Sequence, residues 1–295
     1  MSFRLFIYYC AICGGWAAFL TWGILAATGM RGNVNFYLWA SLTGGLLGMI
    51  LASAIGAVDA VLNAVGIQRY VRVGMCLVIG LFGGMFGGVV GEFLRKTLHF
   101  PVFIGWMLTG IGIGASIGVF DLLRAKVKGG DMRMPLKKTL NGIYGGFLGG
   151  FLGGVLFGLM SPNDKIPRTD LAIGLVILGL CIGLFVGLAQ VFLKEAWIKV
   201  AQGFRAGREL MLSKDETTIG RAESCDLGLF GDNSIERMHA RIVLKDNRYL
   251  LADAETPGGT FLNNERIGRL TPLKSGDVIR VGNSVIEFGE RQKRT

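Results

Sequence analysis

The chain has 295 residues, of which 51% are hydrophobic and 18% charged, and its mean hydropathy is +0.50. That is too apolar for an ordinary soluble domain. Residues 1–195 contain 36 of the 47 glycines, 15 Lys and Arg, and only 7 Asp and Glu, whereas residues 196–295 have the charge mixture of a soluble domain. The net charge of +10 therefore belongs mainly to the apolar part, where it is typical of membrane topology and of contact with anionic lipid. Nucleic-acid binding is not expected, because the basic residues lie in short loops and form no continuous patch.

The N-terminal part contains six apolar runs of the length that a membrane-spanning helix needs, about 20 residues. They are residues 5–29, 36–64, 73–94, 102–123, 140–161 and 171–194. The first run is longer than the apolar region of a signal peptide, about 7–15 residues, so we expect a first spanning helix. The sequence predicts a multi-pass α-helical membrane domain over residues 1–195.

Basic residues in the connections predict the orientation of these spans. With the N-terminus inside, the inner connections carry Arg69, Arg72, Arg124, Lys126, Lys128, Arg133, Lys137 and Lys138, and the outer ones carry fewer. The positive-inside rule then predicts that both termini are cytoplasmic. We expect anionic lipid at the inner loops, and the style of the sequence suggests a bacterial inner membrane.

The spans repeat as three helical hairpins. The second, fourth and sixth spans close with IGAVDAVL (55–62), IGVFDLLR (117–124) and VGLAQVFL (186–193), in steps of 62 and 69 residues. Glycine pairs recur in the other spans, as in GGFLGGFLGG (145–154), and allow helix backbones to approach closely in lipid. Such faces favour packing within one bundle, a homo-oligomer or, less readily, a glycine-lined pore.

Asp59, Asp121 and Gln190 occupy equivalent positions in these repeats. Acids within a membrane are candidate ion or proton sites. The alternative is that both acids are helix-end residues that bind nearby bases, Arg69 and Arg72 or Arg124 and Lys126. No proline interrupts the middle of a span, which disfavours the broken helices of a transporter.

Catalytic chemistry is not expected. The chain has two histidines, His99 and His239, and no phosphate-loop motif, so neither a paired-histidine metal site nor a Ser/His/Asp triad is easily built. Cys10 and Cys13 form a C-x-x-C pattern inside an apolar run without a second ligand pair. We therefore predict no enzyme, no metal and no cofactor.

Short alternating strands with turns follow the last span. Ten are expected: IKVAQG, RELML, TTIG, DLGLF, HARIVLKDN, RYLLADA, TFLNN, ERI, DVIRVG and SVIEFGE. Without any helical periodicity, this pattern predicts an all-β sandwich over residues 196–295. Trp197 is either an interfacial anchor or a strand residue.

Several residues of this part occur in the order and spacing of one family. They are Gly220-Arg221, His239, Gly259-Thr260, Asn263, and Gly276-Asp277 with Gly282. Together they resemble the forkhead-associated (FHA) domain over about 90 residues. The resemblance implies an eleven-stranded β-sandwich whose apical loops bind phosphothreonine in a partner protein. It does not extend to the membrane part.

The resemblance also implies roles for single residues. Arg221 matches the family's phosphate-binding arginine, and His239 matches a histidine that braces the loop before it. A phosphate carries a charge of about −1.5 to −2, so its site needs guanidinium and hydroxyl or amide donors. The predicted site comprises Arg221, Arg237, Glu236, Ser224, Gly258, Gly259 and Thr260, with Gly220, His239 and Asn263 as architectural residues.

Two positions depart from the family pattern. Glu236 replaces a serine that donates to the phosphate, and Gly258, after Pro257, replaces an asparagine that grips the peptide backbone. An ionised glutamate about 4 Å from a phosphate dianion costs several kcal/mol at an effective dielectric constant of about 20. Either Glu236 pairs with Arg221 and the domain binds partners without phosphate, or Glu236 points away and Arg221 with Arg237 captures phosphothreonine.

Ser224, Ser234 and Thr256 are candidates for a substitute hydroxyl. The leading hypothesis is a membrane-anchored signalling adaptor that binds phosphothreonine proteins. The alternatives are a channel or transporter regulated by its FHA domain, and an oligomeric scaffold that uses contacts with unphosphorylated proteins.

Overall fold

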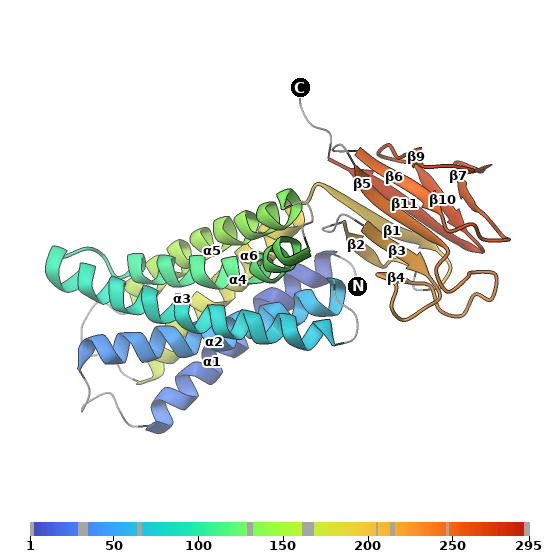
Figure 1. The fold of residues 1–295 in the computed structure, drawn as a ribbon. Helices are drawn as coiled ribbons and strands as arrows, with labels where there is room; N and C mark the ends of the chain where they lie inside the picture. The colour runs from blue at the N-terminus through green and yellow to red at the C-terminus, as the bar shows by residue number, and fades with distance from the viewer. Residues whose placement is uncertain are drawn as a thin grey trace.

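The computed structural model describes residues 3–28, 35–63, 67–128, 132–160, 168–204, 206–212, 216–245 and 248–291. These residues form an elongated helical bundle followed by a β-sandwich at one end of the bundle (Figure 1). The N-terminal end of the first helix lies at the same end of the bundle as the sandwich.

Six long helices make up the bundle. They are α1 (Phe3–Thr28), α2 (Phe36–Asn63), α3 (Gln68–Leu98), α4 (Phe103–Lys128), α5 (Arg133–Met160) and α6 (Arg168–Phe192). Within the described residues, six segments of these helices are long and apolar enough to cross a membrane. Each contains or overlaps one of the six predicted spans.

Glycine determines which helices pack most closely. A Cβ atom on Gly48 of α2 would collide with the carbonyl oxygen of Gly80 of α3, and one on Gly110 of α4 with that of Gly146 of α5. Gly179 of α6 stands in the same relation to α1. The α2–α3, α4–α5 and α6–α1 interfaces, which join neighbouring predicted hairpins, are thus as closely packed as α3–α4, where a Cβ atom on Gly91 would collide with Gly105.

The glycines of α5 pack on two sides. Gly146 and Gly150 face the backbone of α4, whereas Gly145 and Gly149 face the backbone of α6. Both faces of the GGFLGGFLGG segment are therefore filled within the chain. This arrangement corresponds to the predicted packing within one bundle.

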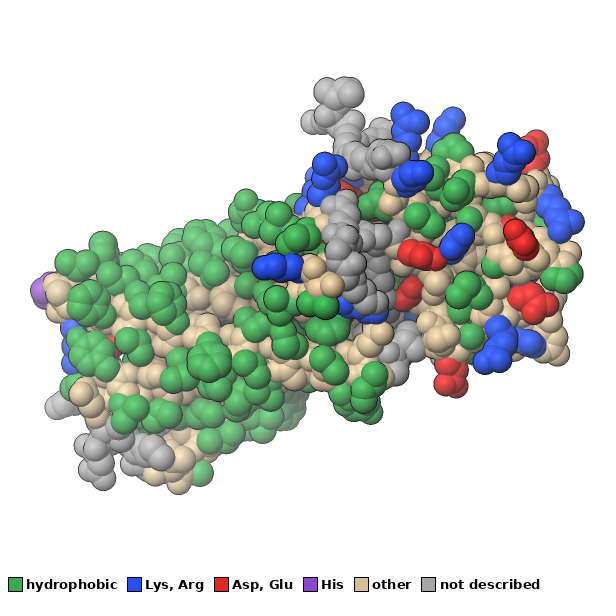
Figure 2. Space-filling view, in the orientation of Figure 1, with side chains coloured by type: hydrophobic (Ala, Val, Ile, Leu, Met, Phe, Trp, Pro, Cys, Tyr) green, Lys and Arg blue, Asp and Glu red, His purple; other side chains and the backbone are tan. Residues whose placement is uncertain are grey.

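Aliphatic side chains fill the interior of the bundle. The fully buried ones are Leu47, Leu51, Ile55, Ile113, Ile117, Leu175, Leu178, Ile182 and Val186. The outside of the bundle also presents mostly hydrophobic side chains, whereas Lys, Arg, Asp and Glu gather on the sandwich and at its junction with the bundle (Figure 2). A helical surface with apolar side chains on both its inner and outer sides is typical of a membrane span.

The sandwich consists of two sheets. Its strands are β1 (Ala196–Gln202), β2 (Glu209–Met211), β3 (Glu216–Gly220), β4 (Leu227–Gly228), β5 (Ala240–Lys245), β6 (Arg248–Asp253), β7 (Thr260–Leu262), β8 (Glu265–Arg266), β9 (Thr271–Pro272), β10 (Val278–Val281) and β11 (Ser284–Glu290). One sheet has the order β2-β1-β11-β10-β7-β8 and the other β4-β3-β5-β6-β9. Alternate side chains of β1 (Ala196, Ile198, Val200) are buried between the sheets.

Ten strands were predicted and β9 was missed. It has only two residues, Thr271 and Pro272, which pair with Leu251 and Leu250 at the edge of a sheet. Proline lacks an N–H group and is confined to such edges, so this pairing leaves almost no pattern in the sequence.

Candidate functional site

Four loops meet at the end of the sandwich that lies away from the helices. They are residues 221–226, 229–239, 254–259 and 282–283. β1 starts beside the bundle and runs away from it, and its last residue, Gln202, pairs with Val285, close to the 282–283 loop. We call these four loops the apical loops.

Arg221 joins two apical loops, because it belongs to the 221–226 loop and bonds the 229–239 loop. Its backbone N–H donates to the carbonyl oxygen of Glu236 at 2.9 Å, and its Nη1 donates to Oδ1 of Asn233 at 3.0 Å. A Cβ atom on the preceding Gly220 would collide with the carbonyl oxygen of Arg237, which explains the glycine there. Among the described residues, no ion pair joins Arg221 to Glu236, so the alternative in which Glu236 neutralises Arg221 is not the arrangement seen.

Glu236 is held by its backbone while its side chain remains exposed. Its N–H donates to Nδ1 of His239 at 3.1 Å, and its carbonyl accepts from Arg221. His239 is fully buried, and its Nε2 lies 3.1 Å from the carbonyl oxygen of Gly259 and 3.2 Å from Oγ1 of Thr256. Since Nδ1 accepts, Nε2 carries the proton and donates to Gly259, so the imidazole links two apical loops.

Two aspartates tie the apical loops together. Asp232 accepts from the N–H and hydroxyl of Ser234 and, at 2.8 Å, from the N–H of Asn283. Hydrogen bonds from the Ser234 side chain, first of all, hold the pKa of Asp232 below its usual value. This leaves the Ser234 hydroxyl committed to Asp232. It is therefore not free to replace the missing serine.

Asp253 likewise holds the 254–259 loop through hydrogen bonds. It accepts from the N–H and hydroxyl of Thr256 and from the hydroxyl of Thr260. Burial of Asp253 acts to raise its pKa, but the hydrogen bonds from Thr260 and Thr256 outweigh burial and lower it. Both threonine hydroxyls are thus used inside the domain, and Thr260 is fully buried.

The remaining predicted residues lie around this framework. Ser224, Arg237 and Gly258 are exposed on three different apical loops. Gly259 has φ +65°, in the left-handed region, whereas Gly258 has no such constraint, and a Cβ atom there would make ordinary contacts with Ser234 and His239. The structure therefore brings Arg221, Arg237, Glu236, Gly258 and Ser224 to one end of the sandwich.

Asn263 was placed near the site, and this prediction was wrong. Asn263 follows β7 at the other end of the strand from Thr260, where it bonds Asp277 and the N–H of Val278, both at 2.9 Å. It has φ +50° and stabilises the turn between β7 and β8. Order along the chain placed it close to the Gly-Thr pair, but the direction of the strand carries it away.

Sequence reasoning missed three residues of the apical loops and one residue of β8 that contacts them. Asn233 holds Arg221, Asp232 and Asn283 join two loops, and Arg266 approaches the carbonyl oxygens of Thr256 and Pro257 at 3.4 Å. The D-x-S pattern of Asp232 and Ser234 is a signal for a side chain that caps its own turn. No local pattern indicates Arg266, because it reaches the loop from β8.

The predicted intramembrane polar residues also meet. Asp59 (α2), Arg72 (α3), Asp121 (α4) and Lys138 (α5) form a charged cluster in which each base contacts both acids. Nη1 of Arg72 lies 2.5 Å from Asp59, and Nζ of Lys138 lies 2.9 Å from Asp59 and 3.1 Å from Asp121. The four residues have exposed fractions between 0% and 8%, so their charges are satisfied mainly by one another.

This cluster confirms Arg72 as a partner of Asp59 and corrects the partner expected for Asp121. Arg124 was expected beside Asp121, but it donates to Gln68 instead, at 2.6 Å. Arg72 and Lys138 were counted among the inner connections, yet both are buried within helices. Gln190 of α6 joins the group by donating to the carbonyl oxygen of Lys138 at 3.0 Å.

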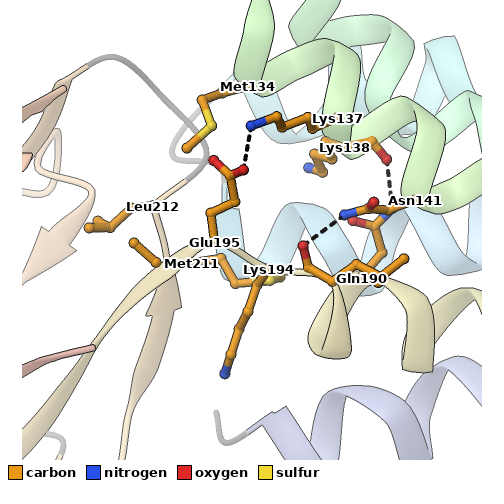
Figure 3. Close-up of a pocket in the computed structure, with 11 residues that line it drawn as sticks. Met134, Lys137, Lys138, Asn141, Gln190, Lys194, Glu195, Met211 and Leu212 are labelled. Atoms are coloured by element: carbon orange, nitrogen blue, oxygen red, sulfur yellow. Dashed lines mark hydrogen bonds and ion pairs between the residues drawn. The ribbon is translucent and has the colours of Figure 1, made fainter. Parts of the chain in front are cut away.

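The sandwich is docked against this end of the bundle. A small pocket lies between α5, α6, β1 and β2, and Figure 3 shows Glu195 turned toward Lys137, with which it forms an ion pair. Met134 of α5 packs into the hydrophobic core of the sandwich. Trp197 proves to be a residue of strand β1, and its ring packs against Lys194 at 4.0 Å.

The N-terminus of α1 takes part in the same junction. The N–H of Phe3 donates to Glu209 of β2 at 2.6 Å, and Lys194 lies 3.4 Å from the ring of Phe3. Burial lowers the pKa of Lys194 to about 8, although Glu209 acts in the opposite direction. Contacts from α1, α5 and α6 thus fix the sandwich relative to the bundle.

A family model matches the part of the chain that contains the apical loops. Residues 217–282 match the model of the FHA domain. The C-terminal part of this chain is an FHA domain. The match includes Arg221, Glu236, His239 and Gly258.

The relatives share this domain. FhaB of Mycobacterium tuberculosis, named as an FHA domain-containing protein, is 27% identical over 92 residues, which cover 31% of this chain and 59% of FhaB. The E3 ubiquitin-protein ligase CHFR of Xenopus laevis is 35% identical over 96 residues, which cover 30% of this chain and 15% of CHFR. The chain thus spans less than two thirds of the length of either relative.

A solved structure from a study of phosphothreonine-dependent FHA domain interactions contains a chain that is 29% identical in sequence to this one. The match covers 34% of this chain and 100% of that chain, with a TM-score of 0.31.

Proposed function

We propose that this protein is a membrane-anchored adaptor whose FHA domain binds phosphothreonine-containing proteins on the cytoplasmic side of a bacterial inner membrane. The observation that carries the proposal is the position of Arg221 on the apical loops of an FHA domain, joined to Asn233 and not to an acid. A guanidinium has five N–H donors, so the bond to Asn233 leaves several for a phosphate.

Membrane anchoring is supported by the six apolar helices and their hydrophobic outer surface. The basic residues Arg69, Lys126 and Arg133 lie at the ends of helices close to the sandwich, which supports a cytoplasmic sandwich by the positive-inside rule. The same residues support contact with anionic lipid. Because the sandwich is docked on the bundle, its apical loops face away from the membrane, where a protein partner can reach them.

The described residues do not favour the alternative functions. A conducting path needs polar groups or water along its length, whereas the buried side chains of the bundle beyond the charged cluster are mainly aliphatic, with Thr21, Thr43 and Thr109 among a few hydroxyls. The glycine faces of α5 are occupied by α4 and α6, so they offer no groove to a second copy. A homo-oligomer and the absence of enzymatic activity stay predictions.

Binding of phosphopeptides to the full chain, purified in detergent, tests the proposal. A library of phosphothreonine peptides and their unphosphorylated forms is measured by fluorescence polarisation. We expect tighter binding of phosphorylated peptides, and a loss of at least about tenfold in Arg221→Ala, since a charge-assisted bond to phosphate is removed. Arg248→Ala, an exposed arginine at the other end of the sandwich, is the matched control. Equal binding of both peptide forms would refute the proposal.

A further inference from the structure

Glu236 and Gly258, the two departures from the family pattern, lie on different apical loops next to the same side chain, that of His239. Nδ1 of the buried His239 accepts from the N–H of Glu236, and a Cβ atom on Gly258 would lie 3.8 Å from Cε1 of the same ring. A Cβ atom there would also lie 3.6 Å from the carbonyl oxygen of Ser234. The backbone of Glu236 and the Cβ position of Gly258 therefore both adjoin the ring of His239 on the apical loops.

The backbone of Glu236 has little freedom. Its N–H is bonded to His239 and its carbonyl to Arg221, and the next carbonyl, that of Arg237, accepts from Ala222 and Cys225. The exposed side chain of Glu236 thus extends from a backbone that is fixed at the rim of the site. Among the described residues, neither a hydrogen bond nor an ion pair engages this carboxylate, although Arg221 and Arg237 are its neighbours in the loops.

Gly258 leaves space on the neighbouring apical loop. It is exposed, and the contacts around its Cβ position are ordinary van der Waals contacts, so a side chain of a ligand can lie over it. A ligand that brings only negative charge meets attraction at Arg221 and repulsion at Glu236. A ligand that brings a negative group together with a positive one satisfies both.

We infer that the apical loops bind phosphothreonine segments that carry a lysine or arginine close to the phosphothreonine. Arg221 binds the phosphate, and the cation lies over Gly258 and pairs with Glu236. Glu236 is thereby a specificity-determining residue, which attracts basic segments and repels acidic ones. This inference rests on the proposed function of the same site.

The test compares matched phosphothreonine peptides that differ only in one flanking residue. A lysine, an alanine or a glutamate is placed at successive positions on each side of the phosphothreonine, and binding to the full chain in detergent is measured. We expect lysine at one or more positions to strengthen binding by about fivefold over glutamate, the range of a solvent-exposed ion pair. The preference should decrease as salt is added, because exposed charges are screened.

Glu236→Gln removes the charge and keeps the size of the side chain, so it should abolish the preference for lysine while the alanine peptide still binds. Glu265→Gln, an exposed glutamate on β8, is the matched control and should keep the preference.

If lysine and glutamate peptides bind equally and both still require Arg221, the inference fails and the proposed function stands. If no phosphopeptide binds more tightly than its unphosphorylated form, both fail.

Discussion

Charged side chains are arranged differently inside the bundle and at the apical loops of the sandwich. In the bundle, Asp59, Arg72, Asp121 and Lys138 are buried and satisfy one another. In the sandwich, Arg221 and Glu236 are neighbours on exposed loops and do not pair. Charges that neutralise one another join helices, whereas charges held apart by their backbones remain available to a ligand.

The largest effect is expected from breaking the charged cluster. Arg72→Met leaves Asp59 and Asp121 buried with Lys138 alone, and removal of one partner of a buried ion pair costs about 3–5 kcal/mol. Thermal unfolding in detergent should show a large drop in the midpoint temperature of this variant. Lys126→Met, which removes an exposed lysine of α4, should change stability by less than about 0.5 kcal/mol.

Replacing all four residues of the charged cluster tests whether the stability is lost because a buried charge has no partner. In the quadruple variant Asp59→Leu, Arg72→Met, Asp121→Leu and Lys138→Met no buried charge is left, so much of the lost stability should return. Failure of the quadruple variant to recover would show that the cluster does more than join the helices.

The next effect concerns glycine in the bundle. Gly146→Ala places a methyl group against the carbonyl oxygen of Gly110, so α4 and α5 must separate, at a cost of about 1–3 kcal/mol. Gly74→Ala is the matched control, since nothing lies within 4 Å of its Cβ position. Because alanine favours helix by up to about 1 kcal/mol, this control should be neutral or stabilising in the same unfolding measurement.

A smaller effect is expected at Asp253. Asp253→Asn weakens the bonds from Thr256 and Thr260 and should destabilise the sandwich by about 1–2 kcal/mol.

The pKa of Asp253 is lowered in the folded state, so its stabilising contribution is present above the unfolded value, about 3.9, and is lost as the pH falls through the folded value. Unfolding followed from pH 6 to pH 3 should therefore be less acid-sensitive in the variant. An unchanged acid dependence would contradict this role.

The smallest change in stability is expected at Gly258. Gly258→Asn restores the amide of the family pattern at a position with room for a Cβ atom, so stability should change by less than about 0.5 kcal/mol. We expect severalfold tighter binding of alanine-flanked phosphopeptides, because the amide can hold the peptide backbone. Gly259→Ala, next to it, has to adopt φ +65° and should destabilise by about 1 kcal/mol.

Much of the fold follows from local patterns. Apolar runs longer than 20 residues indicated all six helices, and period-two alternation indicated ten of the eleven strands. The strand that was not predicted, β9, consists of a threonine and a proline, and two residues show no alternation of hydrophobic and polar side chains. The FHA pattern located Arg221, Glu236, His239 and Gly258, because spacing along the chain is all that such a pattern requires.

The failures share a cause, which is that proximity in space does not follow from spacing along the chain. Lys138 is 79 residues from Asp59, and hydropathy gives no indication that they pair. Asn263 is three residues from Thr260, yet it lies beyond the other end of β7, in the turn to β8. Arg266 reaches the 254–259 loop only because β8 folds back on β7.

The sequence by itself determined where helices and strands occur and which residue types stand at the apical loops, since both depend on neighbouring residues. Only the tertiary structure decided which charges meet: Arg72 and Lys138 with two acids inside the bundle, and Arg221 with Asn233 rather than Glu236. The physical reason is that an ion pair depends on the separation of two groups in space, and packing of distant segments sets that separation.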